Sequence, residues 1–426
     1  MLMFLIFIAL LALICINVPI AIALAMAGVM GLLATEGVSS LVSIALDMYS
    51  GSTKFSLIAI PMFVLAGAIM NAGGITDKLI NFVSAIIGFV RGGLAMVNIG
   101  VSLFFAEISG SAVADVAAMG SILIPQMKKR GYSAPFSAAV TSSSASLAII
   151  IPPSIPMILY ASSSNTSVEQ LFVAGVVPGL LGAAGLMLVA YVFARRYNLP
   201  TEEAFNVKRL RETFIDALPA FTLPIIILGG IFGGYVTATE AAGLAVVAAL
   251  VVSAWYRNLD LRHLRRAMLD GGIQTAVVML LVASSVLMGG FLTRAQVPQD
   301  IANAILNITN EQWVILLILN FFFLVVGFFL HSAAAIILVV PIVIPLITAA
   351  GIDPVHFGLV VTLNLAIGQQ TPPVASVLIT SCAVARANIW DVSKVNIWFI
   401  LVLLFVLLLC TYVPSVPLFL VEYFYR

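Results

Sequence analysis

Two acidic residues lie in an apolar stretch of the sequence, one on each side of a run of small residues. Glu107 and Asp115 flank Ser109-Gly110-Ser111 among Val, Leu, Ile, Ala and Phe. A carboxylate in such surroundings is costly and is retained where it binds a cation, carries a proton or pairs with another group. Asp115 can offset the dipole at the start of a helix, whereas Glu107 lies at the opposite end and needs a cation or a buried ion pair.

Proline clusters interrupt two later apolar segments. One cluster is Pro152-Pro153, and the other is Gly368–Pro373. Proline lacks an N–H and disfavours helical geometry at the residue before it, so each segment must unwind at its centre. Unpaired backbone at membrane depth persists only where it lines a cavity or binds a ligand. Carbonyls at the end of one half-helix suit Na⁺, and N–H groups at the start of the next suit a carboxylate.

We therefore predict that backbone carbonyls bind Na⁺ in one cluster in each half of the chain. Gly327 and Gly368 would let the backbone approach the ion closely, and Thr371 could add a hydroxyl ligand. Na⁺ is expected as the coupling ion, with no other cofactor. The predicted cation-binding residues are Glu107, Ser109, Gly110, Ser111, Ala148, Ile151, Gly327, Leu330, Gly368 and Thr371.

The half-helices that follow the interruptions are predicted to direct their positive ends into a shared mid-membrane pocket. Such a pocket suits an anionic substrate, and nearby amides and hydroxyls could contact the rest of the molecule. The predicted substrate-binding residues are Ser111, Asp115, Ser154, Ser332, Asn364 and Gln370.

Other chemistries find little support. His331 precedes Ser332, but adjacent residues do not generally face each other and no nucleophile elbow surrounds them, so no catalytic residue and no enzyme activity are expected. Cys15, Cys382 and Cys410 lie in apolar runs without metal-ligand spacing, which predicts neither a disulfide nor a transition-metal site. A net charge of +1 argues against a nucleic-acid partner.

The composition requires a membrane environment. Hydrophobic residues make up 62% of the chain and charged residues 9%, against about 45–50% and about 25% in soluble domains. Apolar runs long enough to cross a bilayer recur along the chain and are too uniform for barrel strands. The fold class is therefore an all-α polytopic membrane protein. Residues 1–33 form either one retained span or two short spans split near Pro19.

Basic residues alternate with loops that lack them. Because basic loops stay in the cytoplasm, this alternation predicts the orientation of the bundle. Basic clusters lie at 128–130, 195–211 and 257–266, and loops without Lys or Arg lie at 36–47, 165–170, 235–240 and 351–356.

The sequence repeats at a constant offset. Ile124-Pro125, Gly131 and Pro152-Pro153 recur 220 positions later as Ile344-Pro345, Gly351 and Pro372-Pro373. This pattern indicates a duplication, with chance alignment as the alternative. An odd number of crossings between the repeats would invert the second. The predicted units are 1–215, with a re-entrant hairpin at 93–127, a broken helix at 133–164 and a charged linker at 195–215, and 216–426, with an extra span, a hairpin at 311–348 and a broken helix at 354–385.

Four segments resemble a known family. Glu107–Asp115, Ile124–Met127, Ile151–Ser154 and Gly368–Pro373 are similar to the large membrane subunit of tripartite ATP-independent periplasmic (TRAP) transporters. The resemblance implies an elevator-type, Na⁺-coupled importer of the bacterial inner membrane, with sialic acid favoured as substrate and a C4-dicarboxylate next.

The resemblance also implies two protein partners, a periplasmic substrate-binding protein and a small membrane subunit, the latter expected as a separate chain. Membrane lipid is the remaining expected partner. The alternatives left open are a stand-alone Na⁺/anion symporter, a channel and an intramembrane hydrolase.

Overall fold

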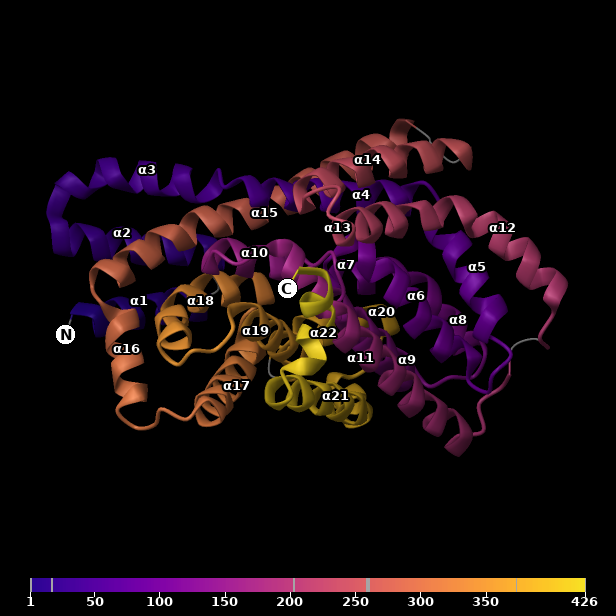
Figure 1. Cartoon of the computed structure of the whole chain (residues 1–426). Helices are drawn as coiled ribbons and strands as arrows, with labels where there is room; N and C mark the ends of the chain where they lie inside the picture. The colour runs from indigo at the N-terminus through magenta and orange to yellow at the C-terminus, as the bar shows by residue number, and fades with distance from the viewer. Residues whose placement is uncertain (1, 17, 202–203, 258–260, 373, 426) are drawn as a thin grey trace.

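The computed structural model describes residues 2–16, 18–201, 204–257, 261–372 and 374–425, and within these ranges the side chains of 2–4, 11, 15, 107–109, 261 and 263 are left out. All regular elements in the described part are helices. Nine helical runs there are long and apolar enough to cross a membrane. The prediction of an all-α polytopic membrane protein is confirmed (Figure 1).

One group of helices forms a frame at the edge of the molecule. We call α2, α3, α4, α14 and α15 the frame helices, because α15 packs against α2, α3 and α4 while α14 packs against α4. Glycine permits the closest of these contacts, since a Cβ on Gly28 would lie 2.9 Å from Met288 N. The frame helices and the preceding α1 are α1 Leu2–Cys15, α2 Ile20–Glu36, α3 Ser40–Ser52, α4 Ala59–Ala72, α14 Ala238–Trp255 and α15 Leu261–Arg294.

Two structural repeats form the core. Each has an arm helix, a hairpin, a broken helix and a long closing helix, and the matching elements from hairpin to closing helix begin 219 to 221 positions apart. The first repeat has α5 Ile75–Ile87, α6 Gly93–Ser109, α7 Ala112–Asp115, a π turn Val116–Gly120, α8 Ser121–Lys129, α9 Ala134–Ala145, α10 Ile155–Ser164 and α11 Val168–Arg196. The second has α16 Val297–Leu306, α17 Gln312–Phe329, α18 Ser332–Ala349, α19 Pro354–Gly368, α20 Ser376–Ala385 and α21 Ile389–Tyr412.

The remaining elements complete the described chain. They are η1 Gly37–Ser39, η2 Phe55–Ile58, η4 Ser146–Ile149, α12 Val207–Pro224, a π turn Ile225–Gly229, α13 Gly230–Phe232 and α22 Ser415–Tyr425.

Two hydrogen bonds show that the repeats are inverted. Lys128, just before the first broken helix, donates through Nζ to the carbonyl oxygen of Ala385, at the end of the second (2.9 Å). Tyr160, near the end of the first broken helix, donates through its hydroxyl to the carbonyl oxygen of Pro354, at the start of the second (2.8 Å). The start of each broken helix therefore lies beside the end of the other, so the two run in opposite directions.

Both hairpins enter and leave on one side, as re-entrant hairpins must. In the second, Gln312 Nε2 at the start of α17 donates to the carbonyl oxygen of Ala350, just after α18 (2.9 Å). In the first, Leu94 near the start of α6 and Gln126 near the end of α8 line the same cavity. The predicted fold class, with two hairpins and two broken helices in inverted repeats, is thus present.

The N-terminal stretch contains two helices, α1 and α2, rather than one. They pack against each other and are separated at Pro19, where proline ends helical geometry in the residue before it. Of the two possibilities that the sequence left open for residues 1–33, the structure thus has the one divided near Pro19, and the inversion rests on the contacts between the broken helices.

Candidate ion and substrate site

In the first repeat, the hairpin tip touches the break in the helix that follows it. Gly110 joins α6 to α7 with a left-handed φ of 57°, a conformation that glycine adopts without steric cost. A Cβ at this position would lie 3.0 Å from the carbonyl oxygen of Pro153 and 3.1 Å from the nitrogen of Ile155. The tip and the break are therefore in backbone-to-backbone contact.

The second repeat makes the equivalent contact through two glycines. A Cβ on Gly368 would lie 2.6 Å from the Cα of Gly327 and 3.0 Å from its carbonyl oxygen. The nitrogen of Val374, beyond the break, donates to the carbonyl oxygen of Phe328 (3.3 Å). The close backbone approach expected from Gly327 and Gly368 is present, and it excludes any larger side chain at either position.

Ser154 at the first break caps the half-helix that follows it. Ser154 Oγ donates to the carbonyl oxygen of Ile149 (2.7 Å) and accepts from the nitrogen of Met157 (3.4 Å). It thereby satisfies a free carbonyl and caps the start of α10. Ser111 precedes α7 in extended backbone. Its carbonyl oxygen accepts from the nitrogen of Asp115 (3.0 Å), whose side chain is fully buried.

Asn396 is a buried site residue that sequence reasoning missed. It lies on α21, and its Oδ1 accepts from Ser143 Oγ of the first repeat (2.7 Å). Its Nδ2 contacts the carbonyl oxygen of Gln370 at the second break (3.3 Å) and that residue's Oε1 (3.4 Å). One amide therefore connects the two repeats at the level of a break.

A backbone carbonyl at the helix break has different neighbours in the two repeats. Ile150 and Gln370 are 220 positions apart, and the residues against their carbonyls, Gly175 and Asn396, are 221 apart. A Cβ on Gly175 would lie 2.2 Å from the oxygen of Ile150. In the first repeat the Ile150 carbonyl therefore packs against the backbone of a glycine. In the second, the Gln370 carbonyl accepts a hydrogen bond from a side-chain amide.

Asn364 has a buried oxygen without a hydrogen-bond partner among the described residues. Its Nδ2 donates to Asn320 Oδ1 (2.7 Å), and Asn320 Nδ2 donates to Thr411 Oγ1 (3.1 Å). Asn364 Oδ1 lacks any such contact although the residue is fully buried. It lies one helical turn before Gly368, so an acceptor is available next to the glycine contact.

The first repeat has a comparable polar connection between its hairpin and broken helix. Asn98 Nδ2 on α6 donates to Thr141 Oγ1 on α9 (2.7 Å), and Asn98 Oδ1 accepts from Ser144 Oγ (3.2 Å). Ser102 Oγ also donates to Ser144 Oγ (3.0 Å). In both repeats, buried side chains thus join the first hairpin helix to the first half of the broken helix.

The remaining predicted residues are spread around these contacts. Thr371 Oγ1 donates to the carbonyl oxygen of Ile367 (3.0 Å), and Ser332 is the buried first residue of α18. Ala148 is buried in η4, whereas the Ile151 side chain packs toward Gly179 of α11.

Leu330 is extended at the tip of the second hairpin. The side chains of Glu107 and Ser109 lie outside the described part. No group of His, Cys, Asp or Glu suited to a metal ion occurs among the described residues.

Comparison with known proteins identifies the family. A family model described as "Tripartite ATP-independent periplasmic transporter, DctM component" matches residues 7–416. The C4-dicarboxylate TRAP transporter large permease protein of Pseudomonas aeruginosa is 37% identical over 377 residues, covering 88% of each chain. The sialic acid TRAP transporter large permease protein of Vibrio cholerae is 35% identical over 385 residues, covering 89% of each.

A solved structure supports the fold. The Alcanivorax borkumensis YdaH transporter superposes with a TM-score of 0.65 over 89% of each chain at 14% sequence identity, a likeness that concerns the fold alone. The family model spans almost the whole chain, and both relatives exceed 30% identity over most of their length. The chain therefore belongs to the DctM family and is a multi-pass permease of the bacterial inner membrane, the large membrane component of a tripartite ATP-independent periplasmic transporter.

Proposed function

We propose that this permease imports an organic acid by coupling its movement to Na⁺, through an elevator motion of the repeat core against the frame helices. The observation that carries the proposal is the paired contact between hairpin tip and helix break, which occurs once in each inverted repeat. Discontinuous helices in inverted repeats are the usual place of ion and substrate sites in secondary transporters.

The Na⁺ sites are proposed at these two contacts. The first joins Gly110 to the Pro153–Ile155 break, and the second joins Gly327 to Gly368. Each places the carbonyl-bearing end of one half-helix beside another segment of backbone, an arrangement suited to a hard cation that prefers oxygen ligands. The buried Oδ1 of Asn364 is an acceptor without a described donor, so we add it to the second site as a side-chain ligand.

The substrate is proposed to be a carboxylate held between the two contacts, near the starts of α7 and α18. Relatives named for a C4-dicarboxylate and for sialic acid are similar to this chain at 37% and 35% identity. Those values support the class of organic acids and do not separate its members. Sialic acid, favoured by the sequence motifs, is the first compound to test and a C4-dicarboxylate the second.

The moving unit is proposed to be the repeat core. Buried polar bonds join hairpin to broken helix within each repeat, and Asn396 joins the repeats to each other. The frame helices have their own close contacts through Gly28 and Gly31. Sliding the repeat core past the frame helices as a whole leaves the hydrogen bonds inside each of them intact. Dividing either one would break buried polar bonds and leave unsatisfied groups in the membrane.

The test uses Gly368→Val in proteoliposomes that contain the complete tripartite system. A branched side chain at this position would force the Gly327 backbone away, so uptake should lose its dependence on an inward Na⁺ gradient or require several-fold more Na⁺ for half-maximal rate. The measured quantity is the Na⁺ activation curve for uptake of radiolabelled sialic acid and of succinate.

Gly28→Val is the matched control, because its side chain would crowd backbone between α2 and α15 at a comparable distance, away from the proposed sites. Its Na⁺ activation midpoint should stay at the wild-type value even if its expression falls. A wild-type activation curve for Gly368→Val, or wild-type uptake that ignores the Na⁺ gradient, would refute the proposed coupling.

A further inference from the structure

A cavity of about 360 Å³ lies between the repeat core and the frame, which are in contact elsewhere through α15 and α18. Its frame wall includes Lys54 and Arg294, and its core wall includes Ser162 and Ser163 at the end of α10 and Ile337 on α18. Pockets for small ligands begin at about 300 Å³. The volume is therefore sufficient for a small organic acid on the boundary along which the two bodies are proposed to slide.

The cavity lies toward the side opposite the basic loops. Thr239 Oγ1, in the first turn of α14, donates to the carbonyl oxygen of Phe55 (3.4 Å). Beside it, Glu169 Oε1 in the first turn of α11 accepts from the nitrogen of Ala238, the first residue of α14 (3.3 Å). Lys54 is thus adjacent to loops that the charge distribution places outside the cytoplasm.

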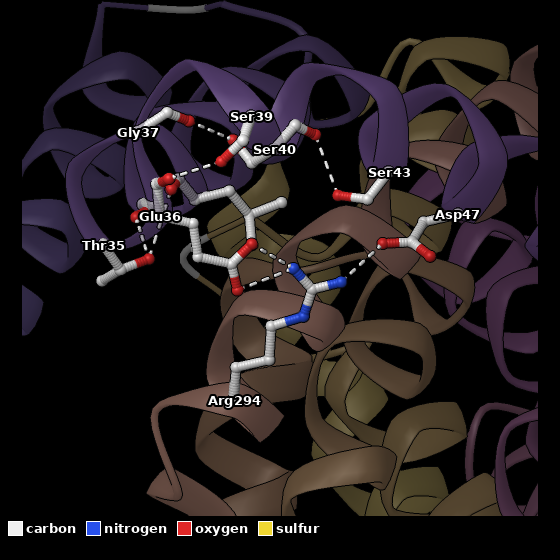
Figure 2. Close-up of polar contacts among 10 residues, drawn as sticks. Thr35, Glu36, Gly37, Ser39, Ser40, Ser43, Asp47 and Arg294 are labelled. Carbon is white, nitrogen blue, oxygen red and sulfur yellow. Dashed lines mark hydrogen bonds and ion pairs between the residues drawn. The ribbon is translucent and has the colours of Figure 1, made fainter.

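The charges in the cavity are unequally matched. Figure 2 shows the Arg294 guanidinium between two carboxylates, with NH1 2.7 Å from Glu36 Oε2 and NH2 3.2 Å from Asp47 Oδ2. Lys54 instead donates to a neutral group, the carbonyl oxygen of Ser162 (2.6 Å). It forms no ion pair with any carboxylate in the described part of the chain. The two carboxylates more than neutralise Arg294 within the frame, whereas the described partner of Lys54 is a neutral carbonyl.

Glycine keeps the space beside Lys54 open. On α15, a Cβ added to Gly289 would meet no atom within 4 Å, although Gly289 lines the cavity. Ser163 approaches from the opposite wall and is half-buried. The cavity thus has a cation, hydroxyl groups and a glycine-made opening, the ingredients of a carboxylate site.

We propose that this cavity is a receiving site for the carboxylate of an incoming organic anion, with Lys54 as the residue that recognises it. The proposal rests on the transport function given above and assigns a second site to it, distinct from the mid-membrane contacts. A carboxylate is a stronger acceptor for an ammonium group than a peptide carbonyl is. An arriving anion would therefore draw Lys54 away from Ser162 and remove a hydrogen bond between frame and core.

The test measures the charge preference of the cavity without depending on transport. Gly289→Cys is made in a chain in which Cys15, Cys382 and Cys410 are replaced by Ala, and its reaction with the anionic reagent 2-sulfonatoethyl methanethiosulfonate is compared with that of the cationic 2-trimethylammonioethyl reagent. After correction for each reagent's rate with a free thiol, the anionic reagent should react faster. Lys54→Gln should lower that preference by roughly threefold, as expected for one charge at close range in a wet site.

Two further variants make the result decisive. Lys78→Gln is the matched control, since Lys78 pairs with Asp216 (3.1 Å) elsewhere in the molecule, and it should leave the preference unchanged. Lys54→Arg should retain the preference. If Gly289→Cys fails to fold, Ser163→Cys reports from the core wall. An equal rate for both reagents, or a preference that persists in Lys54→Gln, overturns the assignment.

Uptake separates this inference from the proposed function. In the complete reconstituted system, Lys54→Gln should raise the apparent KM for succinate or sialic acid about tenfold or more while the Na⁺ activation midpoint stays constant. A cavity that prefers the anionic reagent in a protein without Na⁺-driven uptake would leave the receiving site standing and reject the coupling. Na⁺-driven uptake by a protein whose cavity reacts equally with both reagents would support the coupling and reject the receiving site.

Discussion

Some buried side-chain amides in this permease form hydrogen bonds between distant segments that could not be predicted from the surrounding apolar sequence. Asn396 bonds Ser143, 253 positions earlier, and the backbone of Gln370. The residues around Asn396 have the apolar composition of a transmembrane helix, so the local sequence does not indicate that Asn396 connects the two repeats. Gly327 and Gly368 were predictable, because glycine beside a helix break already suggests close backbone approach. Asn396 was not, because its role depends on the packing of two repeats.

At the residue scale we predict that Asn396→Leu destabilises the permease by about 1–2 kcal/mol, because the Gln370 carbonyl would lose the donor from Asn396 and the Ser143 hydroxyl would keep only the carbonyl oxygen of Ala139. Reversible unfolding in detergent micelles measures the free energy. Ser143→Ala removes one of the two bonds, so the double variant should cost less than the sum of the single variants. Fully additive losses would mean that the bond between Ser143 and Asn396 contributes no stability.

At the scale of elements, the sequence predicted the helix boundaries that a particular residue type, such as proline, imposes. Proline removes backbone donors, so the breaks between α9 and α10 and between α19 and α20 could be placed from Pro152 and Pro372 alone. The repeat was visible because such constraints recur at a constant offset. The division of residues 1–33 into α1 and α2 was left open, since one proline in an apolar run also fits a kinked single helix.

The inverted arrangement gives a prediction for the hairpin openings. Lys129 ends α8, and Thr348 lies near the end of α18; both are exposed. Single cysteines at these two positions should react with a membrane-impermeant maleimide from opposite sides of sealed, oriented vesicles. The position at Lys129 should be reached from the cytoplasmic side, since it lies in a basic cluster.

Permeabilised vesicles provide the control for this labelling, because both cysteines should then react fully. Labelling of Lys129→Cys and Thr348→Cys from the same side of intact vesicles would contradict the inverted repeats. The hydrogen bonds from Lys128 to Ala385 and from Tyr160 to Pro354 make that result incompatible with this fold.

At the scale of the whole molecule, the arrangement of charge leads us to expect that this permease captures its substrate weakly without a binding protein. The proposed mid-membrane sites offer helix ends, hydroxyls and amides, and Arg294, which lines the cavity between core and frame, is held by Glu36 and Asp47. A site without a bidentate cation binds a dilute carboxylate weakly. In the proposed receiving site, Lys54 is the described cation without an ion pair, so we expect capture to require a high local concentration of substrate.

The last prediction follows from that weakness and from membership of a tripartite family. Proteoliposomes containing this chain, with an inward Na⁺ gradient, should take up no radiolabelled sialic acid or succinate. Addition of the small membrane subunit should leave uptake near background, and further addition of the substrate-loaded periplasmic binding protein should start it. The measured quantity is the initial rate of accumulation at a substrate concentration in the micromolar range.

The control for this reconstitution is an excess of substrate-free binding protein, which should suppress uptake by competing for free substrate. Raising substrate to millimolar concentration in its place tests the physical argument directly, because a weak receiving site should then fill without a carrier. If uptake without the binding protein appears only at millimolar substrate, the role of the binding protein is to deliver substrate to a weak site. Saturable uptake at micromolar substrate by this chain alone would instead mean that its own site binds tightly, and the stand-alone symporter would replace the tripartite mechanism.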